Sequence, residues 1–207
     1  QKPIKKSKQG QFQIVDVVQL FAPICKMTKQ IVNANTIPSL VREAFRIAEE
    51  EKPGPVLLEL PEDIAEEAAE VVDLILPGER HYAVAGKKVI NAAANAIKGA
   101  KRPLVLIGAG ANRKEARRAI SEFIGMIGLP FCNTQMGKGV VDESSSYFLG
   151  TAALSDKDYL HDYIKVADLI VNIGHDVAEK PPFFMEHGGA EVIHINYKSA
   201  QVDQVYF

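Results

Sequence analysis

The feature that most constrains this chain is a series of short, almost continuously apolar segments after residue 87, which alternate with helical patterns. Residues 104–107 read Leu-Val-Leu-Ile, and residues 169–173 read Leu-Ile-Val-Asn-Ile. Strands that are apolar on both faces are typical of parallel sheets covered by helices on both sides. The sequence therefore predicts an α/β fold with a Rossmann-like, doubly wound parallel sheet over residues 87–207.

The alternation is regular along this part of the chain. Strands are predicted at 103–107, 129–132, 168–173 and 191–195, and helices at 87–98, 113–127 and 157–165. In a doubly wound sheet the ligand crevice lies beyond the carboxyl ends of the strands. We therefore look for functional residues in the loops that follow these strands.

Residues 1–70 carry a shorter, incomplete α/β pattern. Thr36 is a candidate cap for an amphipathic helix over residues 37–51, and Pro53-Gly54-Pro55 precedes a strand predicted at 56–60. Residues 15–21 fit either a short helix or a strand.

Acidic residues, prolines and glycines then interrupt the periodicity, which predicts a linker over residues 71–86. The first residue is Gln rather than Met, so we expect the sequence to be cut from a longer chain.

Composition narrows the possible partners. The net charge of −2 gives no global field that would recruit nucleic acid or an anionic membrane. No apolar run approaches the roughly 18 to 20 residues that cross a bilayer.

Two cysteines are too few for a disulfide framework, which favours a reducing, cytoplasmic setting. Because His194 lies within a strand pattern and no metal-ligand spacing occurs, we expect no protein-built metal site. The expected partners are small molecules and further subunits.

One loop has the context of a phosphate site. Gly108, Ala109 and Gly110 follow a predicted strand and precede a helix, an arrangement in which backbone N–H groups approach a phosphate. A full dinucleotide fingerprint would have a small residue in place of Arg113 and an acidic residue in place of Asn133. A tight turn without a ligand and a nucleotide contact therefore both remain open.

Two other loops follow predicted strands. Met136, Gly137 and Lys138 combine a flexible apolar side chain with an ammonium group and could border a cofactor, or form a Gly-rich connection with Lys138 in solvent. His175 and Asp176 are adjacent, so on an extended chain their side chains point apart. A locally hydrogen-bonded loop histidine is expected there rather than a catalytic dyad.

Several segments, taken in order, resemble one enzyme family. They are Phe12-Gln13, residues 15–18, 21–26 and 52–64 in the first part, and residues 100–110, 136–139 and 167–174 in the second. They are similar to acetolactate synthases and related thiamin-diphosphate enzymes over nearly the whole chain. The resemblance implies that residues 1–70 are the C-terminal part of a pyrimidine-binding domain and that residues 87–207 are the central domain.

The resemblance also implies a function. Such an enzyme decarboxylates pyruvate on thiamin diphosphate, with Mg²⁺, and joins the product to a second 2-oxo acid, as in branched-chain amino acid biosynthesis. The activating carboxylate and the Gly-Asp-Gly motif for Mg²⁺ belong to segments that this sequence does not include, and no Gly-Asp-Gly occurs in it. We therefore expect a catalytically incomplete fragment of a cytoplasmic homo-oligomer.

Site residues follow from the same resemblance. Gln13 is a candidate active-site contact, because the Phe-Gln pair of the family lies near the thiamin cofactor. The candidate cofactor-binding residues are Gly108, Ala109, Gly110, Met136, Gly137, Lys138, His175, Asp176 and Asn196. Biosynthetic members line an FAD with several of these positions. Residues 176–180 depart from the Arg-Phe-Asp-Asp-Arg stretch of flavin-binding members, and Asn196 stands where many members have Asp, so the sequence favours absence of FAD over its presence.

Two other functions remain open. The chain could be a non-catalytic nucleotide-binding or regulatory module that uses the same crevice. It could also be a structural spacer and assembly domain that binds neither nucleotide nor thiamin diphosphate.

Overall fold

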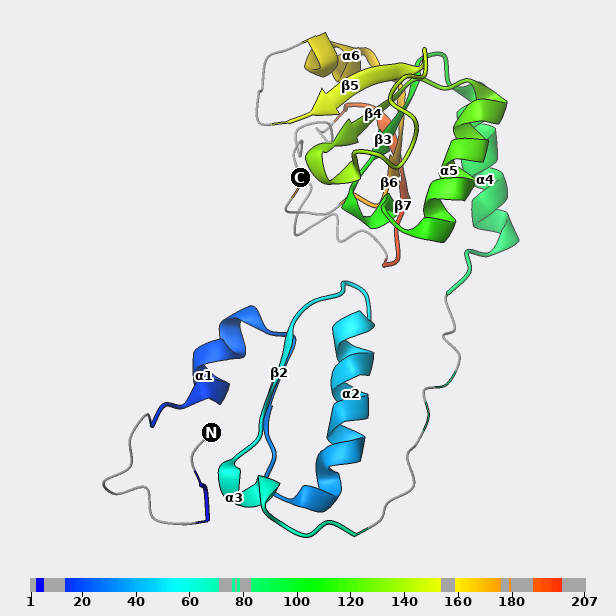
Figure 1. The fold of residues 1–207 in the computed structure, drawn as a ribbon. Coiled ribbons are helices and arrows are strands. Elements are labelled where there is room, and N and C mark those ends of the chain that lie inside the picture. Colours follow the sequence, from blue (N-terminus) through cyan, green and yellow to red (C-terminus); the bar gives the residue numbers. More distant parts are fainter. Residues whose placement is uncertain are drawn as a thin grey trace. The chain divides into compact units, whose positions relative to one another are not determined.

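The computed structural model describes residues 3–5, 14–70, 76, 78, 83–153, 159–175, 179 and 188–198. The chain divides into two compact units, residues 1–81 and 82–207 (Figure 1).

The second unit contains a five-stranded sheet in which every pairing is parallel. Its strands are β3 (Pro103–Ile107), β4 (Phe131–Thr134), β5 (Phe148–Ala152), β6 (Leu169–Ile173) and β7 (Glu191–Ile195). They lie in the order β5-β4-β3-β6-β7. The chain therefore adds β4 and β5 on one side of β3, and then β6 and β7 on its other side. This arrangement confirms the predicted Rossmann-like α/β sheet, and it places the topological switch point between β3 and β6.

Helices cover both faces of this sheet. They are α4 (Lys87–Gly99), α5 (Lys114–Ile127) and α6 (Tyr159–Val166), and Figure 1 shows α4 and α5 side by side on one face. Val105 and Val171 belong to the core on the side of α5, whereas Leu104 and Ile170 belong to the core with the buried residues of α6. Neighbouring residues of a strand point to opposite faces. Because both faces are covered, β3 is apolar throughout, and β6 is apolar except at Asn172.

Two features fasten the ends of these elements. Gly128 ends α5 with φ 68°, a left-handed conformation that glycine adopts without the steric cost of a side chain. At the other end of the sheet, the carboxylate of Asp168 accepts hydrogen bonds from the amides of Lys101 (2.8 Å) and Arg102 (2.9 Å). These amide hydrogen bonds hold the pKa of Asp168 below its ordinary value. The carboxylate thereby joins the segments that enter β3 and β6.

The first unit contains a two-stranded parallel sheet of β1 (Met27–Gln30) and β2 (Val56–Glu59). Its helices are α1 (Val17–Phe21), α2 (Ile37–Glu49) and α3 (Glu62–Ala65), with 3-10 turns η1 (Ala22–Ile24) and η2 (Ala34–Thr36). The segment that fitted either a helix or a strand forms α1, and the side chain of Asp16 accepts a hydrogen bond from the amide of Gln19 (2.9 Å). Thr36 precedes α2, but its hydroxyl donates to the carbonyl of Asn33 (2.7 Å) instead of capping the helix.

Within the residues that the structure describes, no helix is long and apolar enough to traverse a bilayer.

Candidate functional site

The loops at the carboxyl ends of β3, β4 and β6 meet backbone against backbone at glycines. Gly108 follows β3, Gly137 ends the 3-10 turn η4 (Gln135–Gly137) after β4, and Gly174 follows β6. A Cβ atom at Gly108 would lie 2.5 Å from the Cα atom of His175, and one at Gly137 would lie 2.1 Å from the carbonyl oxygen of Ile107. Only glycine fits at these positions, and it allows the loops of three adjacent strands to touch.

Two of the amides for which a phosphate contact was left open are bonded within the protein. The N–H of Gly108 donates to the carbonyl of Ile173 (2.8 Å), and the N–H of Gly110, in the 3-10 turn η3 (Ala109–Ala111), donates to the carbonyl of Gly174 (2.7 Å). Both bonds join the turn after β3 to the end of β6. This turn therefore uses its amides to connect two strands.

The third amide of the turn binds a carboxylate. The N–H of Ala109 lies 3.0 Å from each carboxylate oxygen of Glu179, a residue six positions beyond the end of β6. The hydroxyl of Thr134, at the end of β4, donates to the same carboxylate. Its oxygen also accepts a hydrogen bond from the N–H of Gly137 (3.1 Å). One carboxylate thus bonds to the turns after β3 and β4.

The loop after β6 is also tied to the loop after β7. The Nδ2 of Asn196 donates to the backbone carbonyl of His175 (3.0 Å), and the N–H of Gly174 donates to the carbonyl of Ile195 (2.8 Å). His175 itself is buried. Two of the predicted site residues, Gln13 and Asp176, lie outside the described residues.

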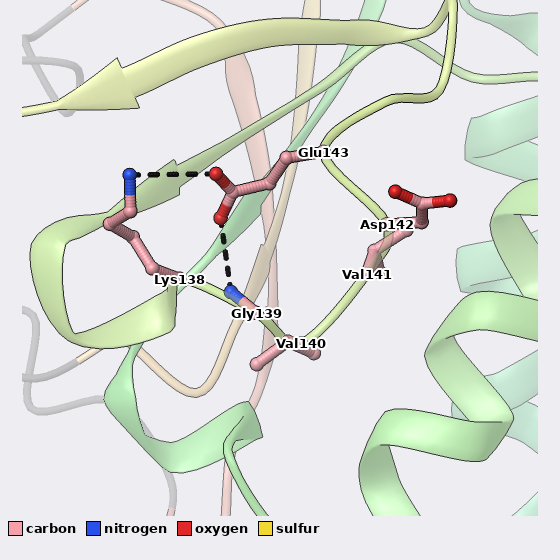
Figure 2. Close-up of a pocket in the computed structure, with 6 residues that line it drawn as sticks. All are labelled: Lys138, Gly139, Val140, Val141, Asp142 and Glu143. Atoms are coloured by element: carbon pink, nitrogen blue, oxygen red, sulfur yellow. Dashed lines mark hydrogen bonds and ion pairs between the residues drawn. The ribbon is translucent and has the colours of Figure 1, made fainter.

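Residues 138–143 line an open depression of about 560 Å³ beside this edge (Figure 2). The carboxylate of Glu143 accepts hydrogen bonds from the N–H of Gly139 (3.0 Å) and from Nδ2 of Asn133 (3.0 Å), and it lies 3.4 Å from Nζ of Lys138. The amide of Gly139 is the main reason that the pKa of Glu143 lies below its ordinary value. Lys138 is thus directed to Glu143, and Met136 is 64% exposed.

Two buried asparagines flank β3 in the sheet. Asn133 of β4 lies opposite Ile107 of β3, and Asn172 of β6 lies opposite Leu106 of β3. Within the described structure, the Oδ1 atom of each has no hydrogen-bond partner. Nδ2 of Asn172 lies 3.2 Å from Nδ1 of His194, whose pKa is lowered by burial. His194 is therefore placed in the sheet beside a polar neighbour.

In the described part of the chain, no group of three or more His, Cys, Asp or Glu side chains is arranged to hold a metal ion. The carboxylates found at the crevice, Glu179 and Glu143, bind protein amides instead. Neither carboxylate was assigned a role from the sequence. In the sequence, each is only an acidic residue within ten positions of the end of a buried strand. Because polar loops commonly contain such residues, this pattern could not single them out.

The family described as thiamine pyrophosphate enzyme, central domain, matches residues 90–207, more than half of the chain and most of the second unit. The chain belongs to this family. The matched central domain contains the parallel sheet and the glycine turns described above, so the resemblance inferred from the sequence is confirmed.

Curated relatives extend the similarity to the first unit. A probable acetolactate synthase large subunit of Methanococcus aeolicus is 28% identical over 210 residues, covering 98% of this chain and 35% of the relative. An acetolactate synthase of Bacillus subtilis (strain 168) is 30% identical over 199 residues, covering 94% and 34%. A glyoxylate carboligase of Escherichia coli O157:H7 is 25% identical over 211 residues, covering 99% and 35%. The chain therefore spans about a third of the length of these relatives.

Proposed function

We propose that the chain supplies the central domain, with an adjoining α/β segment, of an acetolactate-synthase-like carboligase. Such an enzyme decarboxylates pyruvate and joins the product to a second 2-oxo acid. The observation that carries this proposal is the similarity to acetolactate synthases, which covers 98% of the chain in one relative and includes both units.

Thiamin diphosphate and Mg²⁺ are the cofactors of the proposed enzyme. The described residues do not offer a donor set for Mg²⁺, and the sequence contains no Gly-Asp-Gly. We therefore assign no step to them on the residues of this chain. The proposal places the diphosphate and its metal on other parts of a longer enzyme, and it expects the 207-residue chain alone to leave pyruvate unchanged.

The positions that line FAD in biosynthetic members do not fit a flavin nucleotide here. The amides of Gly108 and Gly110 are bonded to β6 and the loop that follows it, and the amide of Ala109 is bonded to Glu179. A pyrophosphate at this turn would have to displace these bonds and would meet the negative charge of Glu179. We propose instead that this central domain holds no FAD and serves as a packing unit within a homo-oligomer.

The test is to express the complete reading frame and the 207-residue chain side by side, each with pyruvate, thiamin diphosphate and Mg²⁺. We expect acetolactate from the complete protein, dependent on thiamin diphosphate, and none from the 207-residue chain. Glyoxylate as a second substrate separates an acetolactate synthase from a glyoxylate carboligase. A complete protein that releases no CO₂ from any 2-oxo acid would overturn the proposal, and absorbance near 450 nm would contradict the absence of flavin.

A further inference from the structure

The carboxylate of Glu179 is held as a bound anion is held. Among the described residues, the N–H of Ala109 after β3 and the hydroxyl of Thr134 after β4 donate to it. Hydrogen bonds from amides and hydroxyls to a charged acceptor are stronger than those between neutral groups. These donors face the crevice edge of the sheet, where doubly wound folds bind phosphate groups on such turns.

We propose that Glu179 is a built-in anion that occupies this position and excludes phosphate-bearing ligands from it. The carboxylate of a side chain and the phosphate of a nucleotide carry the same sign of charge and would use the same two donors. Only one of them fits there at a time. This extends the proposed absence of flavin by naming the residue that causes it, and its test does not depend on carboligase activity.

The geometry around the turn supports the exclusion. Gly110 lies so close to Gly174 that an added Cβ atom would be 2.9 Å from the carbonyl oxygen of Gly174. The backbone of Gly174 therefore lies against the turn, and Glu179 binds the amide of Ala109 between the two amides that are bonded to backbone carbonyls.

The same carboxylate is a positioning residue for the sheet edge. It bonds to the turns after β3 and β4 while belonging to the segment after β6, so one side chain connects the three central strands. Thr134 extends this connection, because its hydroxyl donates to Glu179 and accepts from the N–H of Gly137. Loss of Glu179 is expected to loosen the turns while the strands stay paired.

The first experiment measures this connection directly in the 207-residue chain. Amide hydrogen exchange is followed by NMR in the wild type and in Glu179→Ala and Glu179→Gln. We expect exchange at the amide of Ala109 to accelerate at least about tenfold in Glu179→Ala, with a smaller effect in Glu179→Gln, which keeps one acceptor oxygen. The amide of Val105, which is bonded to the carbonyl of Pro130, should not change. Glu115→Gln, an exposed carboxylate at the start of α5, is the matched control.

A double-mutant cycle of Glu179→Gln with Thr134→Val tests the shared hydrogen bond. We expect the two substitutions to be non-additive by about fivefold or more in the unfolding equilibrium constant. Additive effects, or an Ala109 amide that exchanges at the wild-type rate in Glu179→Ala, would overturn the positioning role. If Glu179→Ala does not fold, the exchange comparison is made with Glu179→Gln.

The second experiment tests the exclusion with FAD, ADP and inorganic phosphate, each at millimolar concentration. A ligand that binds only the folded state raises the melting temperature. We expect none of the three to raise that of the wild type or to slow exchange at Ala109. Stabilisation of the wild type by FAD or ADP, with slower exchange at Ala109, would overturn the exclusion. Stabilisation by phosphate alone would show that the carboxylate is displaced by a simple anion and would overturn it equally.

Discussion

Substitution of Gly137 by alanine tests the backbone packing at the sheet edge. The added Cβ atom would lie 2.1 Å from the carbonyl oxygen of Ile107, which is 0.9 Å closer than the 3.0 Å limit of real contacts. The obstacle is backbone of the central strand, so η4 has to retreat. That movement stretches the bond from the Gly137 N–H to Thr134. Overpacking costs about 1 to 3 kcal/mol, and loss of a buried hydrogen bond costs about as much, so we expect a loss of about 2 to 6 kcal/mol.

The assay is urea unfolding followed by the NMR signals of amides in β3 and β6, so that this unit is measured separately from residues 1–81. Gly125→Ala is the matched control, since Gly125 lies within α5 on its solvent-exposed side, and a Cβ atom there would meet open space. It should raise the free energy of unfolding by about 0.5 to 1 kcal/mol. A Gly137→Ala variant within about 1 kcal/mol of the wild type would refute the argument from close packing.

Two further predictions concern ionisable groups. Complete burial raises the pKa of Cys132 to about 12, so a thiol reagent at pH 8 should modify Cys25 alone in the folded chain and both cysteines in denaturant; early modification of Cys132 would contradict its burial. The pKa of Asp168 is lowered by the amides of Lys101 and Arg102, so its stabilising contribution is present above the ordinary value of 3.8 and lost as pH falls through the lower folded-state value. Asp168→Asn should therefore lower the melting temperature at pH 7, and its difference from the wild type should shrink as the pH falls below 3.8; a pH-independent difference would argue against this cause.

Much of the sheet could be predicted because β3 and β6 carry apolar residues on both faces. The predicted bounds of β3 and β7 agree with the structure, and β6 begins one residue later than predicted. β5 was not predicted. It is an edge strand with Gly150 at its centre, at φ 137°, so neither continuous apolarity nor strict alternation marks it. β1 was missed for a related reason, because its sequence Met-Thr-Lys-Gln is mostly polar.

The site was predictable only where local sequence determines it. Gly108 and Gly110 indicate a tight turn by their residue type alone. The role of Glu179 could not be predicted in the same way, because it contacts Ala109 across 70 positions of sequence and only the strand order brings the two together. The sequence left a nucleotide contact and a tight turn without a ligand both open, and in the folded chain the amide of Ala109 donates to the carboxylate of Glu179.

The side chains of β3 and β6 point alternately to the two helix layers, and this affects how the unit tolerates substitutions in its core. Leu104 and Val105 are adjacent in sequence, yet they contribute to separate apolar cores, and the backbone of the sheet lies between these cores. A void opened beside α6 has no route by which side chains from the α4 and α5 layer could refill it. The sheet thus separates the two cores, and the side chains of each core have to fill their own space without help from the other face.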